Sequence, residues 1–333
     1  MNGAVDVVIP WVDGYDKNWL KKKAEYTGTK TSEKEGEYNT KARYRDYGTL
    51  KYLFRSIEKN ATWVNHIFLV TDNQIPEWLN KDNRKVTIID HKDFIPDKYL
   101  PTFNTNTIEL NIHRIKALSE NFVLFNDDMI INSKTEKNDF FKNELPVDVI
   151  SFNVNNSHDE FSHILLNDMV IINKNFDKKR VIKNNFFKLF DFKNASQIIR
   201  TLLSLPWSGI TGFYNPHLGV PYQKSAYEMV WKSNYDILNR TCSNKVRTFN
   251  DVSDWLIRYW QMCSGKFVQG KVSAGKFFTL NDIKELKQEL TKDSKYKQIC
   301  INDSDKQDHY EENIELLNEY LEKKFPDKSK FEI

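Results

Sequence analysis

Short apolar runs alternate with amphipathic segments up to residue 125, and this alternation constrains the fold more than any other feature of the sequence. Runs rich in Val, Ile and Phe occupy residues 5–11, 66–71, 86–89 and 122–125. Residues 44–59 carry an apolar stripe at helical spacing between the first two runs, and residues 107–118 carry another before the last run. Strands that alternate with helices favour an open, largely parallel sheet covered by helices. We therefore expect an α/β fold.

The rest of the chain predicts helices and loops around this sheet. Residues 17–40 are polar and charged, which favours a short helix followed by a loop able to act as a lid. Residues 173–210 are basic, Asn-rich and aromatic, and indicate a helical insertion that lies over the ligand site or on a membrane-facing side. Further helical patterns occupy residues 224–238, 252–262, 282–290 and 310–321. The sequence contains neither an internal repeat nor a clear linker, so we expect a single domain over residues 1–333.

The composition limits the partners and the compartment. The 49 Lys and Arg residues and 46 Asp and Glu residues are mostly mixed along the chain, which argues against a nucleic-acid partner. The three cysteines, Cys242, Cys263 and Cys300, fit neither a disulfide framework nor a paired metal motif, which indicates a reducing compartment. No apolar run approaches the roughly 20 residues that a membrane span requires. We expect a cytoplasmic protein, either in solution or peripheral at the inner face of the plasma membrane.

Polar clusters directly follow three of the predicted strands. They are Asp13 with Gly14 and Asp16, Asp72 with Asn73, and Asp127 with Asp128. In an open parallel sheet, ligands bind beyond the carboxyl ends of the strands, where the loops converge. These clusters therefore mark one candidate ligand edge.

The pair Asp127–Asp128 is a candidate metal site. Hard carboxylate oxygens suit Mg²⁺ and Mn²⁺, and paired acids at a strand end often hold such an ion against a diphosphate. The alternative is that one acid caps a helix or turn while the other faces solvent.

The segment at residues 8–16 is a candidate nucleotide contact. Gly14 permits a tight turn, and Trp11 or Tyr15 could stack on a base. The alternative is an ordinary strand and turn with a buried tryptophan.

Three residues later in the chain are further candidates. His217 lies in a loop rich in Pro and Gly, Arg247 could clamp phosphate oxygens through its planar fork, and Asp303 follows a short apolar run. A core or surface histidine and a solvated arginine are the plain alternatives. Asp303 could join either the metal or the base.

Taken in order, these segments resemble the Stealth family, which includes bacterial capsular hexose-1-phosphate transferases and the catalytic subunit of the lysosomal-enzyme N-acetylglucosamine-1-phosphotransferase. The resemblance rests on four ordered blocks that span residues 6–332. The first block is residues 6–14, and the second is residues 45–57, 63–64, 70–76, 100–104, 112–115 and 126–129. The third is residues 217–229 with Trp231, Thr241, Lys245 and Arg247, and the fourth is residues 299–303, 325–326 and 331–332. Residues 140–210 and 265–295 are expected to be unshared spacers.

The resemblance implies a Rossmann-like core similar to that of nucleotide-sugar transferases, and one catalytic domain. It implies that Asp127, Asp128, His217, Arg247 and Asp303 line the catalytic pocket, with Mg²⁺, or alternatively Mn²⁺, held by the three acids. It also implies a nucleotide site formed by Trp11, Asp13, Gly14, Arg45 and Asp72. Asp13 stands where the animal enzymes tend to carry Asn, and their long inserted domains are missing, so acceptor recognition should differ from theirs.

The resemblance further implies the reaction. An acceptor glycan hydroxyl, on an oligosaccharide or a lipid-linked glycan, attacks the β-phosphorus of a UDP-sugar, and UMP leaves. His217 is the first candidate for the base, because the imidazole pKa near 6.5 suits that role, although it could bind phosphate as a cation instead. Two other readings stay open: a metal-dependent glycosyltransferase that releases UDP, and a non-catalytic glycan-binding protein.

Overall fold

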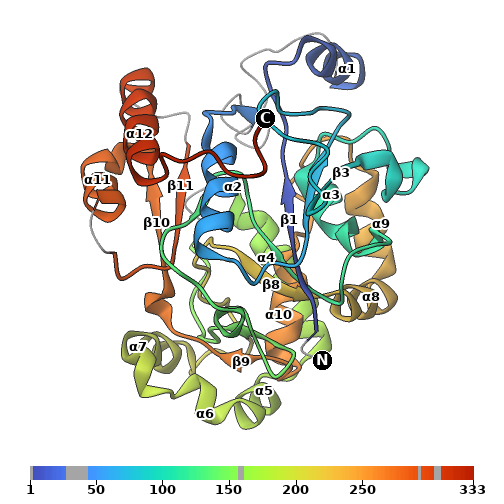
Figure 1. The fold of residues 1–333 in the computed structure, drawn as a ribbon. Helices are drawn as coiled ribbons and strands as arrows, with labels where there is room; N and C mark the ends of the chain where they lie inside the picture. The colour runs from blue at the N-terminus through green and yellow to red at the C-terminus, as the bar shows by residue number, and fades with distance from the viewer. Residues whose placement is uncertain (1–2, 28–43, 157–160, 292–293, 304–308) are drawn as a thin grey trace.

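A five-stranded sheet forms the centre of the protein in a computed structural model that describes residues 3–27, 44–156, 161–291, 294–303 and 309–333 (Figure 1). Its strands, in spatial order, are β3 (Val86–Asp90), β2 (Ile67–Thr71), β1 (Val5–Pro10), β4 (Asn121–Leu124) and β8 (Val220–Gln223). The first four are parallel to one another, and β8 pairs antiparallel with β4 at the edge. The predicted α/β fold with a largely parallel sheet is confirmed.

Both faces of this sheet are buried, which explains why its strands are continuous apolar runs and do not alternate with polar residues. Successive side chains of a strand point to opposite faces. In β1, Val7 and Ile9 therefore belong to one apolar cluster and Val8 to the other. The helix α2 packs on the first face, and α3, α4, α8, α9 and α10 contribute to the second.

The α-helices surround the sheet at the positions that the sequence largely predicts (Figure 1). They are α1 (Lys17–Thr27), α2 (Thr49–Asn60), α3 (Thr105–Asn111), α4 (Phe161–Asn175), α5 (Lys178–Asn184), α6 (Phe186–Leu189), α7 (Ala195–Ser204), α8 (Lys224–Ser233), α9 (Tyr235–Ser243), α10 (Trp255–Cys263), α11 (Ile283–Thr291) and α12 (Tyr310–Lys324). The expected lid loop at residues 28–40 lies outside the described residues. The segment 173–210 contains the end of α4 and the helices α5, α6 and α7, and its being an insertion stays a prediction.

Two helices differ from their predicted bounds. The pattern at 107–118 gives a shorter helix, because α3 ends at Asn111 and continues only as a 3₁₀ turn over Ile112–Arg114. The pattern at 224–238 gives two helices, because the backbone leaves helical geometry at Asn234. The amide of Asn234 donates to the carbonyl of Val230, so it caps α8 at the point where the chain turns into α9.

Two small sheets flank the central one. One consists of β10 (Gly275–Thr279), β11 (Gln298–Asn302) and β5 (Met129–Ile131), and the other of β6 (Phe141–Lys142), β7 (Leu145–Asp148) and β9 (Val268–Gln269). The chain passes from β4 in the central sheet to β5 in the flanking sheet through residues 125–128. The acidic pair Asp127–Asp128 therefore lies at the junction of two sheets.

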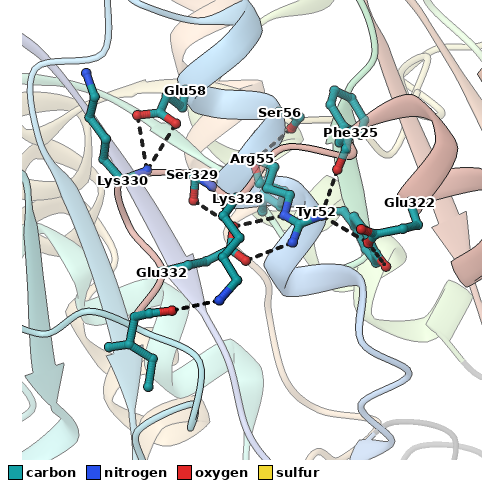
Figure 2. Close-up of polar contacts among 12 residues, drawn as sticks. Tyr52, Arg55, Ser56, Glu58, Glu322, Phe325, Lys328, Ser329, Lys330 and Glu332 are labelled. Carbon is teal, nitrogen blue, oxygen red and sulfur yellow. Dashed lines mark hydrogen bonds and ion pairs between the residues drawn. The ribbon is translucent and has the colours of Figure 1, made fainter.

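Arg55 on α2 binds the C-terminal segment to the core (Figure 2). Its Nε and Nη2 atoms each donate a hydrogen bond of 2.9 Å to a carboxylate oxygen of Glu332. Its Nη1 atom donates to Glu322 at 3.0 Å and to the carbonyl of Phe325 at 2.7 Å. These bonds hold α12 and the last residues of the chain against α2. Among the described residues, no helix has the length and apolar character that a bilayer crossing requires.

Candidate functional site

The strand order creates a ligand cleft between the ends of β1 and β4. The chain goes from β1 to β2 and β3 on one side, and returns to form β4 on the other side of β1. The loops after β1 and β4 therefore diverge, which is where open α/β sheets bind their ligands. A cleft of about 950 Å³ lies there. Seven of the ten predicted site residues line it: Trp11, Arg45, Asp127, Asp128, His217, Arg247 and Asp303.

The remaining three predicted residues stand behind the cleft wall. The backbone of Asp13 forms two hydrogen bonds with the side chain of Gln74, at 3.0 and 2.9 Å. A Cβ at Gly14 would lie 1.9 Å from the carbonyl oxygen of Tyr44, so only glycine allows Tyr44 to reach the cleft there. Asp72 forms an ion pair with Lys22, with 2.6 Å between Asp72 Oδ1 and Lys22 Nζ. These residues shape the wall that Trp11 and Tyr44 present to the ligand.

Trp11 is fixed edge-on by an acid. Its indole Nε1 donates to Asp46 at 2.9 Å, and the residue is buried. One edge of the indole ring is therefore hydrogen-bonded within the protein, while another part of the side chain lines the cleft.

The acidic pair at the end of β4 carries concentrated negative charge. Burial raises the pKa of Asp127 well above its usual range, and the neighbouring carboxylates of Asp128 and Asp46 raise it further. Burial also raises the pKa of Asp128, against the influence of His217, which lowers it. A site that holds three acids in low-dielectric surroundings favours a proton or a cation.

Asp128 lies against His217 and Cys300 on the cleft floor. One potential ligand atom from each of the three residues lies within 4.8 Å of the others. The Oδ1 atom of Asp128 is buried and has no hydrogen-bond partner in the part of the chain that the structure describes. Burial, followed by Asp128, raises the pKa of the Cys300 thiol, so the thiol stays protonated and donates to the carboxylate. The unsatisfied Asp128 oxygen suits a hard cation better than the protonated thiol does.

His217 stands on a strained loop that the protein holds from behind. Its φ of 48° lies in the left-handed region, which is uncommon for a residue other than glycine. The loop before it is held by Asn215, whose Oδ1 accepts hydrogen bonds from Arg258 and Tyr259, each at 2.9 Å. The imidazole packs against Phe277, with ring centroids 5.6 Å apart. The histidine is thus held at the cleft by buried partners.

Arg247 is positioned by a buried acid. Asp251 is fully buried and accepts from the backbone nitrogen of Thr248 at 3.0 Å and from Asn244 at 2.6 Å, which fixes the two ends of the Arg247 loop. The guanidinium packs 5.5 Å above the centre of the Phe161 ring. Among the described residues, Arg247 makes no hydrogen bond, so its donors are available to a ligand.

Arg45 and Asp303 form a joint feature of the cleft. The Nε and Nη2 atoms of Arg45 both bind Asp303 Oδ2, at 2.7 Å each. The same guanidinium lies 4.2 Å from the centre of the Tyr310 ring. Asp303 is therefore neutralised by Arg45 before any ligand binds.

A second carboxyl pair, Glu109 with Asp254, was not predicted from the sequence. Both line the cleft and both are buried, and the two side chains share a hydrogen bond. Burial, followed by the charge of Asp254, raises the pKa of Glu109 well above its usual range, so Glu109 holds the shared proton. Each acid falls within an apolar helical pattern of the sequence. An acid at such a position was the signal that could have indicated a buried functional carboxyl group.

Comparison with known proteins identifies the family. Models of three Stealth regions match the chain: conserved region 1 over residues 3–31, conserved region 2 over residues 43–149 and conserved region 4 over residues 288–333. The second and fourth regions reach into both expected spacers, which are therefore shorter than predicted. His217 and Arg247 fall between the matched regions, so their resemblance to the family stays a prediction.

Whole-length relatives agree with these matches. The chain is 43% identical to a capsular polysaccharide phosphotransferase WcwK of Streptococcus pneumoniae, over 98% of both chains. It is 40% identical to the receptor polysaccharide phosphotransferase WefC of Streptococcus gordonii, over 99% of both chains. It is 39% identical to the exopolysaccharide phosphotransferase cps2G of Lactiplantibacillus plantarum, over 98% of this chain and 96% of that protein. The chain belongs to the Stealth family.

Proposed function

We propose that the protein transfers a sugar-1-phosphate from a UDP-sugar to a hydroxyl of an acceptor glycan, releasing UMP, in capsular or cell-surface polysaccharide biosynthesis. The relatives named as polysaccharide phosphotransferases support the class of reaction. The observation that carries the proposal is the acidic pair of half-buried Asp127 and buried Asp128, which shares one cleft at the switch point of the sheet with His217 and with Arg247, an arginine that has no ion pair among the described residues. A Rossmann-like core for a nucleotide sugar is part of this proposal, and the strand order β3-β2-β1-β4 supports it.

The donor is oriented with its diphosphate between Asp127–Asp128 and Arg247. Trp11 lies beside the expected position of the nucleotide and can offer the free part of its ring to the base. Arg247 supplies planar donors to the oxygens of the β-phosphate, where negative charge develops during transfer. Arg45 remains paired with Asp303, so these two residues together bring no net charge to the cleft.

The acceptor hydroxyl attacks the β-phosphorus, and its proton passes to His217. The bond between the β-phosphorus and the bridging oxygen breaks, and the electron pair leaves with UMP. The bond between the sugar carbon and its oxygen is untouched, so the product is a diester that keeps the anomeric configuration of the donor. Such in-line transfer depends mainly on positioning and charge neutralisation.

Mg²⁺, or alternatively Mn²⁺, fits the oxygen donors of Asp127 and Asp128, and the unsatisfied Asp128 Oδ1 supports this assignment. A bound divalent cation would neutralise the diphosphate. Asp303 would have to leave its ion pair with Arg45 to become a third ligand.

The experiment that tests the proposal follows the donor phosphorus. A panel of UDP-sugars labelled with ³²P in the β-phosphate is incubated with Mg²⁺ and oligosaccharide or lipid-linked acceptors. Label in the glycan product together with unlabelled UMP is the expected result. Label that leaves as UDP would establish the glycosyltransferase reading, and glycan binding without turnover under any metal condition would establish the non-catalytic one.

A further inference from the structure

The helix α7 has its amphipathic character reversed. Its buried residues are polar, at Gln197, Thr201 and Ser204. Its exposed residues include Ile199, Leu202 and Leu203, and Leu203 is 72% exposed. A surface helix of a globular protein normally turns its apolar stripe toward the core. This helix presents the stripe to its surroundings.

Hydrogen bonds lock α7 in this orientation. The hydroxyl of Thr201 accepts from the backbone nitrogen of Phe152 at 3.1 Å, and Ser151 donates to the carbonyl of Gln197 at 3.1 Å. Lys178, which is buried, donates to the carbonyls of Ser204 and Trp207 at 2.8 and 2.6 Å. Rotating the stripe inward would break these contacts, so its exposure is built into the fold.

Neighbouring segments extend the apolar surface. Phe187 on α6 and Phe192 just after it are each 88% exposed, and Trp207 follows α7 with an exposed ring. Figure 1 shows α5, α6 and α7 together at one end of the molecule, the lower end in that view, away from the C-terminus. Exposed aliphatic and aromatic side chains of this number are unusual on a surface that remains in water.

The charge of the same segment is strongly positive. Residues 173–210 contain eight Lys and Arg and two Asp, a net +6, whereas the whole chain carries only +3. Six of the basic side chains are exposed: Lys174, Lys179, Arg180, Lys183, Lys193 and Arg200. The two acids, Asp177 and Asp191, accept backbone hydrogen bonds at helix starts and are thereby satisfied within the protein. An apolar stripe with a basic surround matches an anionic membrane surface.

The surface is continuous with the cleft. A groove of about 500 Å³ begins at Lys193 and Ala195, at the start of α7, and shares Asn215, Pro216 and Phe277 with the cleft. The groove therefore leads from the start of α7 toward the loop that carries His217.

We propose that α5–α7 form a membrane-docking surface that lays the apolar face of α7, with Phe187, Phe192 and Trp207, into the interface of an anionic phospholipid bilayer. This goes beyond the proposed transfer reaction and does not depend on it. The exposed lysines and arginines contact lipid phosphates, while the apolar side chains enter the acyl boundary. The protein docks without crossing the bilayer.

The test is flotation of the full chain with vesicles of phosphatidylcholine alone or with about one third phosphatidylglycerol, in the absence of donor. We expect the protein to float with the anionic vesicles, and high salt to weaken this binding because it screens the lysines. The double variant Leu202→Gln/Leu203→Gln should lose binding about tenfold or more, since two apolar side chains no longer enter the interface. Lys183→Glu/Lys193→Glu should lose at least as much on anionic vesicles.

Matched controls make comparable changes of exposed aliphatic and basic residues elsewhere. Ile75→Gln/Ile333→Gln alters two exposed isoleucines, and Lys81→Glu/Lys284→Glu makes the same change of charge. Both should float like the wild type, and all variants should keep the wild-type melting temperature. The proposal would be overturned if the patch variants and their controls lost vesicle binding equally, or if the wild type did not float. It would also be overturned if a patch variant dissociated a dimer while still floating. Because no donor is present, failure here leaves the transfer reaction untouched.

Discussion

Arg258 and Asp148 form a bidentate ion pair beneath the loop that carries His217. Nε and Nη2 of the guanidinium each donate to a different carboxylate oxygen at 2.7 Å, and the arginine side chain is 1% exposed. The remaining donor, Nη1, reaches the carbonyl of Tyr214 and the side chain of Asn215. A buried charge pair of this kind is retained only when its hydrogen bonds are satisfied. The third nitrogen of Arg258 thereby holds the loop that carries His217.

The first prediction treats Arg258 as a positioning residue. Arg258→Lys keeps the charge but cannot bind Asp148 and Asn215 together, so we expect turnover to fall about tenfold or more while donor affinity changes little. Asn215→Ala should act through the same loop. In a double-mutant cycle, their effects on turnover should therefore be clearly less than additive. Additive effects, or a loss confined to thermal stability, would leave Arg258 with a structural role only. Arg200→Lys on the exposed side of α7 is the control.

The second prediction concerns the acidic pair. Asp127→Asn or Asp128→Asn should lower transfer by about 10²-fold or more, because the site loses a charge that faces the diphosphate. The free energy of unfolding should not fall, since neutralising one acid relieves the repulsion that raises the pKa of Asp127. Turnover across an Mg²⁺ titration and urea unfolding give the two readouts. Asp82→Asn, in an exposed turn, is the matched control, and near-normal rates in both variants would remove the metal assignment.

The parts of the fold that the sequence predicts are those with strong local signals. The strands β1, β2 and β4 are apolar runs buried on both sides, so each is visible without its neighbours, and the half-buried edge strand β3 still carries a short apolar run. The edge strand β8 was missed because Pro221 interrupts a four-residue run, and proline is compatible with a strand mainly at an edge, as it is here. The strand β5 has three residues and depends on β11 for its pairing.

The same distinction applies to the site. Asp127 and Asp128 are adjacent in sequence and follow a clear strand, so their place at a ligand edge could be predicted. Glu109 lies on α3 and Asp254 directly precedes α10, and nothing local indicates that these two helices meet. Asp303 was expected beside the metal, but its pairing with Arg45 depends on the chain returning through β11.

The third prediction separates charge from geometry at Arg247. Arg247→Lys keeps the positive charge and loses the planar fork, so turnover should fall strongly while UMP affinity changes less. Steady-state rates together with calorimetric binding of UMP give the comparison. Arg84→Lys, at an exposed position that does not line the cleft, makes the same change elsewhere and should behave like the wild type. Unchanged kinetics of Arg247→Lys would place this residue outside the reaction.

The fourth prediction concerns stability at the C-terminal segment. Arg55→Ala leaves the buried carboxylate of Glu332 without its partner, which should lower the free energy of unfolding by about 3–5 kcal/mol at pH 7. Burial alone would raise the pKa of Glu332, but hydrogen bonds from Arg55 and Ser329 bring it below its ordinary value. The stability that this pair contributes is therefore present above pH about 4.3 and is lost as the pH falls through the lowered pKa.

The gap between wild type and Arg55→Ala should consequently narrow as the pH falls below about 4. Urea unfolding at several pH values measures it. Lys59→Ala removes an exposed hydrogen bond to the carbonyl of Lys324 and should change the free energy of unfolding by no more than about 0.5 kcal/mol. A gap that stays constant with pH would mean that Glu332 is not the linked group.

The last prediction concerns His217, the candidate base. His217→Ala should lower single-turnover rates by about 10²–10⁴-fold with little change in donor affinity, because the proton acceptor is lost after binding is complete. Alanine adopts the left-handed conformation of this position, φ 48°, less readily than histidine does, so the alanine variant can also disturb the loop. Asparagine tolerates that conformation, so His217→Asn isolates the loss of the imidazole from the loss of loop geometry. Both variants should be equally slow if the imidazole takes the proton. If the imidazole instead binds phosphate as a cation, both variants should bind the donor more weakly, and wild-type activity should be favoured at acid pH. Measuring donor affinity and single-turnover rates from pH 5.5 to 9 distinguishes the two roles, and full activity of His217→Asn with an unaltered pH profile would exclude both.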